Sequence, residues 1–252
     1  MAAGKNSAPT IDVRALETPE DFRGCVRLQQ EVWGFSDEDS LPVRLFIVAR
    51  RIGGQVFGAF DGAELIGFCV ALPGLKPGGG NYLHSNMLGV REKYRDLGLG
   101  RRLKLAQRDD ALSRGVQLIE WTFDPFELKN AFFNMERLGA VVQRYVLNQY
   151  GITSSALHGG LPTDRCTAEW FLNSDRVLAA AAGQPVPKPP IEERIEVRGD
   201  FNNLKRTDPD RAREVQKITS QAFVDAFRRG LAVIGVEKTQ AGGEYLLGRW
   251  KP

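Results

Sequence analysis

Cysteine and histidine are scarce in this chain of 252 residues, which contains three cysteines and two histidines. The cysteines Cys25, Cys69 and Cys166 lie far apart and have no partner at metal-ligand spacing. A structural zinc site needs about four such ligands in close sequence pairs, so we expect no metal site. Unpaired, scattered cysteines are also typical of a reducing compartment, and we expect free thiols in a cytoplasmic protein.

Long apolar runs are absent as well. No stretch approaches the roughly 18 apolar residues of a membrane-spanning helix, and the first ten residues have no apolar core of the signal-peptide kind. Lysine and arginine (34) nearly balance aspartate and glutamate (31), which leaves a net charge of only +3. We therefore expect neither a membrane nor nucleic acid as a partner, and any positive field must be local.

The most informative stretch runs from Asn81 to Gly115 and reads as an apolar strand, a glycine-bearing loop and a basic helix. Arg95, Gly98 and Gly100 have the spacing R-x-x-G-x-G where the helix should begin. The first N–H groups of a helix lack internal acceptors, their dipoles add, and glycine allows a ligand to approach the backbone closely. The pattern indicates a phosphate-binding loop, and Arg101, Arg102 and Lys104 are expected to strengthen its positive field.

Two common phosphate-binding motifs do not match this sequence. A P-loop requires Gly-Lys-Ser/Thr, but Gly100 is followed by two arginines. A dinucleotide fingerprint requires a third glycine at position 103, which is Leu103. The alternative to a phosphate-binding loop is a structural one, in which the glycines allow a tight turn and the arginines form the solvated face of the helix.

The residues on either side have a regular order of expected elements. The strand Ile11–Leu16 is followed by a helix from Thr18 to about Trp33, with Pro19 at its first position. Further along, Asp61-Gly62 between two apolar runs predicts a hairpin. The other expected elements are a helix over 41–51, strands over 55–60 and 64–72, a strand over 118–123, a helix over 126–138 ended by Gly139, and a strand over 140–150.

The remaining third of the chain has a different composition. Residues 179–190, AAAAGQPVPKPP, are typical of an extended linker. Beyond them we expect a strand over 191–197, a helix over 209–229 capped by Asp208, and a hairpin of 231–236 with 245–250. We divide the chain into a disordered N-terminus (1–10), a core (11–178), the linker, and an extension (191–252) that packs on the core or on a neighbouring subunit of a homodimer.

The glycine loop and the order of elements over residues 10–150 resemble the GNAT superfamily of N-acyltransferases. The resemblance implies an α/β (α+β) fold with a mixed, mostly antiparallel sheet flanked by helices, here with a C-terminal strand-helix-hairpin extension. It implies an acyl-CoA co-substrate, acetyl-CoA or succinyl-CoA. It also implies acyl transfer to a primary amine by direct attack in a ternary complex.

Carried onto this sequence, the resemblance assigns two groups of residues to the cofactor. Backbone groups of Met87, Leu88 and Val90 would pair with the pantetheine amides. The pyrophosphate would be bound by Arg95, Gly98, Leu99, Gly100 and Arg101. Asn130 is a candidate for a hydrogen bond to the pantetheine arm, with an ordinary surface asparagine as the alternative.

His84 is the candidate general base, because histidine titrates near neutral pH and lies where histone-type relatives have a glutamate. We expect its face to carry Asn86 and Leu88, since strand side chains alternate. The alternative is a structural strand histidine. Members of the family usually have a tyrosine that protonates the leaving thiolate. The resemblance places Met135 at that position, and its thioether cannot donate a proton. Either the thiolate leaves unassisted, or Tyr145 or Tyr150 replaces that acid.

The acceptor is the least specified part. After the last core strand, Arg165 could bind a carboxylate and Asp164 an ammonium, unless the two form a local structural pair. The chain resembles a bacterial, largely uncharacterised subfamily in three segments: W-T-F-D-P, K-N-A-F-F-N and G-G-L-P-T-D-R. Some members of that subfamily are associated with N-succinylation of amino acids. We expect a small amine, such as an amino acid, as acceptor. The rival prediction is a non-catalytic acyl-CoA-binding module, which Met135 favours.

Overall fold

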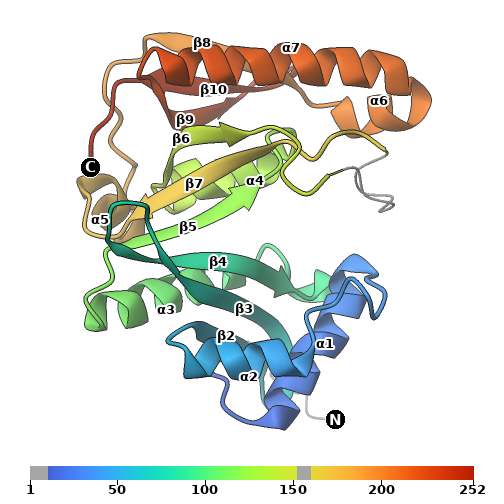
Figure 1. Cartoon of the computed structure of the whole chain (residues 1–252), viewed down its shortest axis with the longest axis vertical. Helices are drawn as coiled ribbons and strands as arrows, with labels where there is room; N and C mark the ends of the chain where they lie inside the picture. The colour runs from blue at the N-terminus through green and yellow to red at the C-terminus, as the bar shows by residue number, and fades with distance from the viewer. Residues whose placement is uncertain (1–10, 152–159) are drawn as a thin grey trace, which may run out of the picture. The chain divides into compact units, whose positions relative to one another are not determined.

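The computed structural model describes residues 11–151 and 160–252 (Figure 1). The predicted disorder of residues 1–10 lies outside these residues. The chain forms two compact units, Met1–Gln117 and Leu118–Pro252. This boundary falls between the basic helix and the following strand, whereas the sequence suggested boundaries near residues 179–190.

The N-terminal unit contains four antiparallel strands in the order β1-β2-β3-β4. Its strands are β1 (Ile11–Ala15), β2 (Gln55–Asp61), β3 (Glu64–Leu75) and β4 (Asn81–Val90), and its helices are α1 (Pro19–Trp33), α2 (Val43–Arg51), the 3-10 turn η1 (Glu92–Tyr94) and α3 (Leu99–Ser113). Helix α1 begins as predicted: the Thr18 hydroxyl accepts the Asp21 N–H at 3.1 Å, and the Asp21 carboxylate accepts the Thr18 N–H at 3.2 Å. Gly62 has φ +58° in the predicted hairpin.

Helices cover both faces of this sheet. One face packs Phe60, Phe68 and Val70 against α1 and α2, whereas the adjacent residues Ala59 and Cys69 contribute to the cluster around α3. Alternate strand residues therefore enter two different cores. Since both faces are buried, β2 and β3 read as nearly continuous apolar runs rather than as alternating ones.

A β-bulge interrupts β4 in its middle. Val70 of β3 pairs with Met87, but the next residue, Ala71, pairs with Ser85, so Asn86 is the extra residue. Side chains on the two sides of Asn86 therefore change face. Leu88 packs in the α3 cluster together with Leu103, and Met87 packs against the α1 and α2 cluster.

The C-terminal unit contains six strands in the order β5-β7-β6-β9-β10-β8. Every pair of neighbours in this order is antiparallel. Its strands are β5 (Leu118–Phe123), β6 (Val141–Val146), β7 (Arg165–Phe171), β8 (Glu193–Arg198), β9 (Ala232–Lys238) and β10 (Gly242–Gly248). Its helices are α4 (Leu128–Phe132), the π-helix η2 (Phe133–Arg137), α5 (Asp175–Ala181), α6 (Phe201–Thr207) and α7 (Pro209–Arg228). Helix α7 lies along the strands of the extension in Figure 1.

The region around Gly139 departs from the predicted helix. Helix α4 begins only at Leu128 and continues as a π-helix, in which the Leu138 N–H donates to Phe133 O at 3.1 Å. Gly139 has φ +75°, and a Cβ there would lie 2.6 Å from the backbone oxygen of Arg176. Glycine is required here for both conformation and space.

The segment predicted as a linker is held in place. Helix α5 includes its first residues, and Val186 is buried. The buried Arg176 guanidinium donates to Pro187 O at 2.6 Å and to Ile234 O at 2.7 Å, and Lys188 Nζ lies 2.8 Å from Glu136 Oε2. Burial lowers the pKa of Arg176 to about 10. The extension continues the sheet of this unit, because β9 pairs with β6.

These elements form a mixed α/β protein whose sheets are mostly antiparallel and flanked by helices, as the sequence predicted. The predicted strand over 140–150 is shorter and ends at Val146, and α5 and α6 were not predicted. Within residues 11–151 and 160–252, no helix is long and apolar enough to cross a membrane.

Candidate acyl-CoA site

The predicted phosphate loop connects β4 to α3 through the 3-10 turn η1. Gly98 precedes α3 in the left-handed conformation, with φ +74° and ψ +8°. No side chain caps this helix, and its first intrahelical hydrogen bond runs from the Arg102 N–H to Gly98 O at 3.1 Å. The N–H groups of Leu99 and Gly100 precede that bond. The helix therefore directs backbone donors and the positive end of its dipole toward the loop.

The cations of the loop differ in what they contact. The Arg91 guanidinium forms ion pairs with Glu31 and Glu64, and Lys93 Nζ lies 3.6 Å from Glu64. Arg95 Nε donates to Val90 O at 3.3 Å, and Arg102 donates to Ile11 O at 2.7 Å. Arg95 is thus held beside the end of β4, and Arg102 is used to fix β1.

Lys104 does not strengthen the field of the loop, contrary to the prediction. Its side chain is only 3% exposed and donates to Ser85 Oγ at 2.7 Å, and Ser85 in turn donates to Gln107 Oε1 at 3.1 Å. Burial lowers the pKa of Lys104 to about 7. Lys104 is therefore part of a buried polar cluster that joins α3 to β4 at the bulge.

The bulge also corrects the expected surroundings of His84. Because Asn86 is inserted, the face of His84 continues to Met87 and not to Leu88. His84 is half-buried and pairs across β3 with Leu72, which packs against the α1 and α2 cluster. The bulge leaves one residue of β4 outside the regular ladder shortly before the strand ends at Val90.

Two predicted residues of the C-terminal unit lie on α4 and the π-helix. Asn130 is exposed on α4. Met135, at the position of the family's tyrosine, is fully buried within the π-helix. Its neighbour Asn134 accepts a hydrogen bond from Trp121 Nε1 at 3.2 Å, so this turn is anchored to β5.

Tyr145 and Asp164 belong to one buried network with Ser220 of α7. The Tyr145 hydroxyl lies 2.9 Å from Ser220 Oγ, which donates to Asp164 Oδ2 at 2.6 Å. Asp164 Oδ1 accepts the Asn148 N–H at 2.8 Å. Burial, together with nearby acidic groups, raises the pKa of Tyr145. Each carboxylate oxygen of Asp164 thus accepts a hydrogen bond from the protein, and its role in binding an ammonium stays a prediction.

Arg165 begins β7, and its guanidinium lies over the ring of Tyr150 at 5.5 Å from the centroid. It also donates to the carbonyl oxygen of Asp164 at 2.9 Å. Together with Lys205 and Asp124 it lines a small cavity next to Pro162. Burial raises the pKa of Asp124. Arg165 thus contacts the ring of Tyr150 and the backbone of Asp164, and its predicted binding of a substrate carboxylate stays a prediction.

Sequence reasoning missed Lys104 as a buried residue and Ser220 as the centre of a network. A signal for Lys104 was available: it lies beside Leu103 and three residues before Gln107, on the face of α3 that faces the sheet. No comparable signal marked Ser220, whose partners lie 56 and 75 residues away in the chain. Within the described ranges, no group of three or more His, Cys, Asp or Glu residues could hold a metal ion.

Comparison with known proteins agrees with this fold. Residues 18–139 match the acetyltransferase (GNAT) family model. NAA60 of Arabidopsis thaliana, solved with a bisubstrate analogue, is 18% identical, with a TM-score of 0.53 over 64% of this chain and 98% of that one. The Escherichia coli ribosomal-protein-S18-alanine N-acetyltransferase is 15% identical, with a TM-score of 0.51 over 73% and 99%.

A third structure, YncA from Salmonella typhimurium with its cofactor acetyl-CoA, is 13% identical, with a TM-score of 0.52 over 65% of this chain and 95% of that one. At these identities the structures establish the fold. No curated protein matches the chain. The family match and the fold together define an acyl-CoA-dependent N-acetyltransferase architecture. Residues 18–139 belong to the GNAT superfamily.

Proposed function

We propose that this protein transfers an acetyl or succinyl group from CoA to the primary amine of a small molecule such as an amino acid. The observation that carries the proposal is the start of α3: a left-handed Gly98, no side-chain cap, and Arg95 fixed beside the end of β4. A diphosphate is the ligand that fits backbone N–H donors, a helix dipole and an adjacent arginine. Arg101, on the first turn of α3, is the second cation of this site.

The bulge of β4 supports a role for this strand in holding the thioester arm. A bulge interrupts regular pairing and changes the direction of local backbone groups. Backbone groups of Met87, Leu88 and Val90 are the proposed partners of the pantetheine amides, and Asn130 is proposed to bind the same arm. Acyl transfer needs the thioester held in one position, because a fixed geometry converts a bimolecular step into an effectively unimolecular one.

In the proposed reaction the amine nitrogen attacks the thioester carbon, the new C–N bond forms and the C–S bond breaks. His84 accepts the proton of the amine, directly or through water, and the leaving thiolate takes a proton from solvent. Tyr145 is a poor acid for that last step, because its raised pKa and its contact with Ser220 keep the proton on the phenol. Met135 offers no proton either.

Calorimetric titration with CoA, acetyl-CoA and succinyl-CoA tests the donor site. Arg101→Glu should abolish binding of all three, whereas Arg51→Glu, an equal change of charge at the exposed end of α2, should leave it unchanged. A preference for one thioester identifies the acyl group. Absence of binding to the wild-type protein would overturn the proposal.

His84→Ala tests catalysis separately from binding. Turnover should fall by about 100-fold while acetyl-CoA affinity stays within twofold, and the acid limb of the pH profile of kcat/KM should disappear. A screen of amino acids and small amines supplies the acceptor. Tight acetyl-CoA binding with no acyl transfer to any amine would instead favour a non-catalytic acyl-CoA-binding module, which the buried Met135 also favours.

A further inference from the structure

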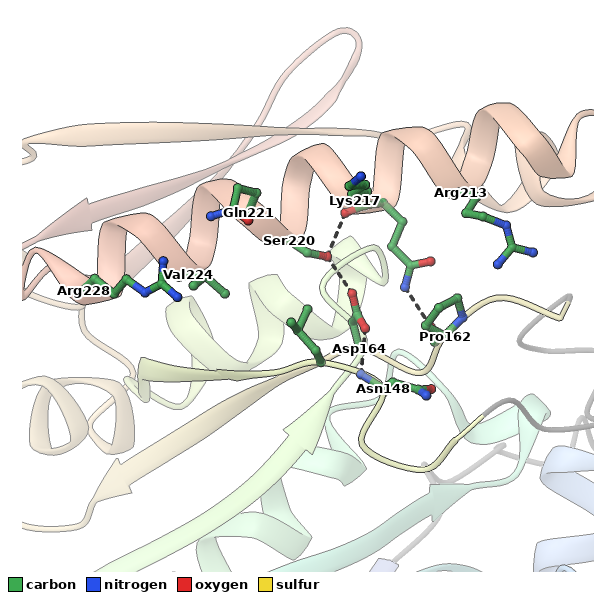
Figure 2. A pocket seen from close by; sticks show the side chains of 11 residues that line it. Asn148, Pro162, Asp164, Arg213, Lys217, Ser220, Gln221, Val224 and Arg228 are labelled. Carbon is green, nitrogen blue, oxygen red and sulfur yellow. Dashed lines mark hydrogen bonds between the residues drawn. The ribbon is translucent and has the colours of Figure 1, made fainter.

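A cavity of about 460 Å³ lies along α7 in the C-terminal unit (Figure 2). Its walls are one face of α7, the residues that follow β6 and the residues that precede β7. The lining side chains include Leu147, Asn148, Pro162, Asp164, Lys217 and Val224. This volume is in the range of small-molecule sites. The α7 wall lies outside the residues that match the family model.

The α7 wall is positively charged at the end where the helix begins. Arg213 and Lys217 are four residues apart, so they project from the same face about 6 Å apart along the axis. Both are exposed, and neither forms an ion pair with any residue in the described part of the chain. Two like charges at this spacing repel each other, and an anion between them removes that cost.

Asp164 does not neutralise this pair. The carboxylate is 6% exposed, and its two oxygens accept hydrogen bonds from Ser220 Oγ and the Asn148 N–H. Figure 2 shows Asp164 directed toward Ser220, while Arg213 projects from α7 about one turn beyond Lys217. The network with Ser220 fixes the cavity floor, and the two cations remain for a ligand.

A second polar group of the lining has an unused acceptor. Gln216, which is 6% exposed, donates through Nε2 to Pro162 O at 2.7 Å, while its Oε1 has no hydrogen-bond partner among the described residues. A buried amide oxygen without a donor is destabilising by about 1–3 kcal/mol. Gln216 lies between Arg213 and Lys217 in the sequence, so its oxygen belongs to the same two turns of α7 as the two cations. A carboxylate has no proton to donate to this oxygen, so Gln216 is not assigned a contact with an anionic ligand group.

The middle of the cavity is apolar. Figure 2 shows Val224 on α7 and Pro162 on the opposite side. Leu147, which follows β6, also lines the cavity. Leu147 is 61% exposed, so its apolar surface is accessible to a ligand. A compact inorganic anion would satisfy Arg213 and Lys217 but would leave this surface uncovered.

We propose that the α7 cavity binds a small organic carboxylate, with its carboxylate between Arg213 and Lys217 and its apolar body against Val224, Leu147 and Pro162. The proposal does not depend on the proposed acyl transfer. It adds to the GNAT domain a second recognition site that is built largely by the C-terminal extension.

Calorimetric titration with hexanoate tests the charge and the apolar body together. Hexanol has the six-carbon apolar chain but no charge. Acetate and inorganic phosphate are anions without that chain. Hexanoate should bind at least tenfold more tightly than each of the other three. Equal or tighter binding of phosphate would overturn the organic-ligand assignment, and no binding of hexanoate would overturn the site.

Matched variants locate the binding. Arg213→Ala combined with Lys217→Ala should weaken hexanoate binding at least tenfold. Arg211→Ala, which removes an exposed cation of the same helix outside the cavity, should change it less than twofold. Val224→Trp should block binding by filling the middle. Unchanged binding in the double variant, with a wild-type circular dichroism spectrum, would refute the proposal.

The acyl-CoA site supplies an independent control. Acetyl-CoA affinity should be unchanged in the Arg213→Ala, Lys217→Ala protein, and hexanoate affinity should be unchanged in Arg101→Glu. Failure of acetyl-CoA to bind the wild-type protein would remove the proposed function and leave this site standing. Loss of hexanoate binding in Arg101→Glu would show that the carboxylate binds at the α3 loop and would overturn the α7 site.

Discussion

Each unit of this protein uses a buried serine to connect a helix to a strand, but the charged partner differs in sign. In the N-terminal unit Ser85 of β4 accepts from the Lys104 ammonium of α3 at 2.7 Å. In the C-terminal unit Ser220 of α7 donates to the Asp164 carboxylate at 2.6 Å and contacts Tyr145. The two helices joined in this way carry the two proposed binding sites.

The comparison teaches that two buried charged groups can differ in how burial affects them. Burial lowers the pKa of Lys104 to about 7, so the ammonium loses its proton within an accessible pH range. The Asp164 carboxylate instead accepts one hydrogen bond from a side chain and one from the backbone, and such bonds stabilise a buried carboxylate. We therefore expect removal of Asp164 to cost stability through lost bonds, and removal of Lys104 to change how stability depends on pH.

Removing the carboxylate of the C-terminal network should have the largest effect. Asp164→Ala breaks the bonds to Ser220 and Asn148 and leaves both donors buried, which should lower the free energy of unfolding by about 3 kcal/mol. Urea unfolding followed by tryptophan fluorescence measures the loss. Asp164→Asn, which keeps one acceptor, should lose less. A loss below about 1 kcal/mol would contradict the network as an anchor of α7.

The Lys104 cluster should instead produce a pH-dependent difference. Between pH 7 and pH 9 the unfolded chain binds more protons at this lysine than the folded one, so wild-type stability should rise with pH. A folded pKa of about 7 against an unfolded one near 10.4 gives an increase of about 2 kcal/mol over that range.

Lys104→Met should lack this increase. Below about pH 6 the two proteins should keep a constant difference, because lysine is then almost fully protonated in both states. Parallel urea titrations at pH 6, 7, 8 and 9 measure it. Parallel stability curves for the two proteins from pH 7 to pH 9 would mean that Lys104 stays charged inside the N-terminal unit.

Tyr145→Phe should have the smallest effect. The phenyl ring keeps its stacking on Phe223, with ring centroids 5.2 Å apart, and only the hydroxyl contact with Ser220 is lost. The free energy of unfolding should fall by about 1 kcal/mol, and acyl transfer should stay within twofold of wild type. Steady-state kinetics checks this, and turnover slowed by about two orders of magnitude would restore Tyr145 as the acid for the leaving thiolate.

Local rules predicted much of the fold because the relevant residues are neighbours in the chain. Thr18, Pro19 and Asp21 form a helix start by contacts within four residues, and Asp61-Gly62 forms a hairpin turn for the same reason. The left-handed Gly98 before α3 was also specified by its own motif. Short apolar or polar stretches such as α5 and α6 carried no clear periodicity and were missed.

The site residues were predicted less well, because side-chain function depends on distant partners. A strict alternation placed Leu88 beside His84, but one inserted residue at Asn86 reversed the faces. Lys104 reads as a solvated cation of a basic helix until α3 is packed on β4, and Asp164 and Tyr145 read as reactive groups until α7 covers them.

The sequence by itself determined the GNAT order of elements, the glycine loop at the start of α3 and the absence of a tyrosine at Met135. Caps, turns and glycine conformations are set by residues a few positions apart. Only the tertiary structure decided which polar groups are buried, where β4 bulges, and that α7 presents Arg213 and Lys217 to a cavity. Burial and pairing arise from contacts between segments tens of residues apart, and no local pattern encodes them.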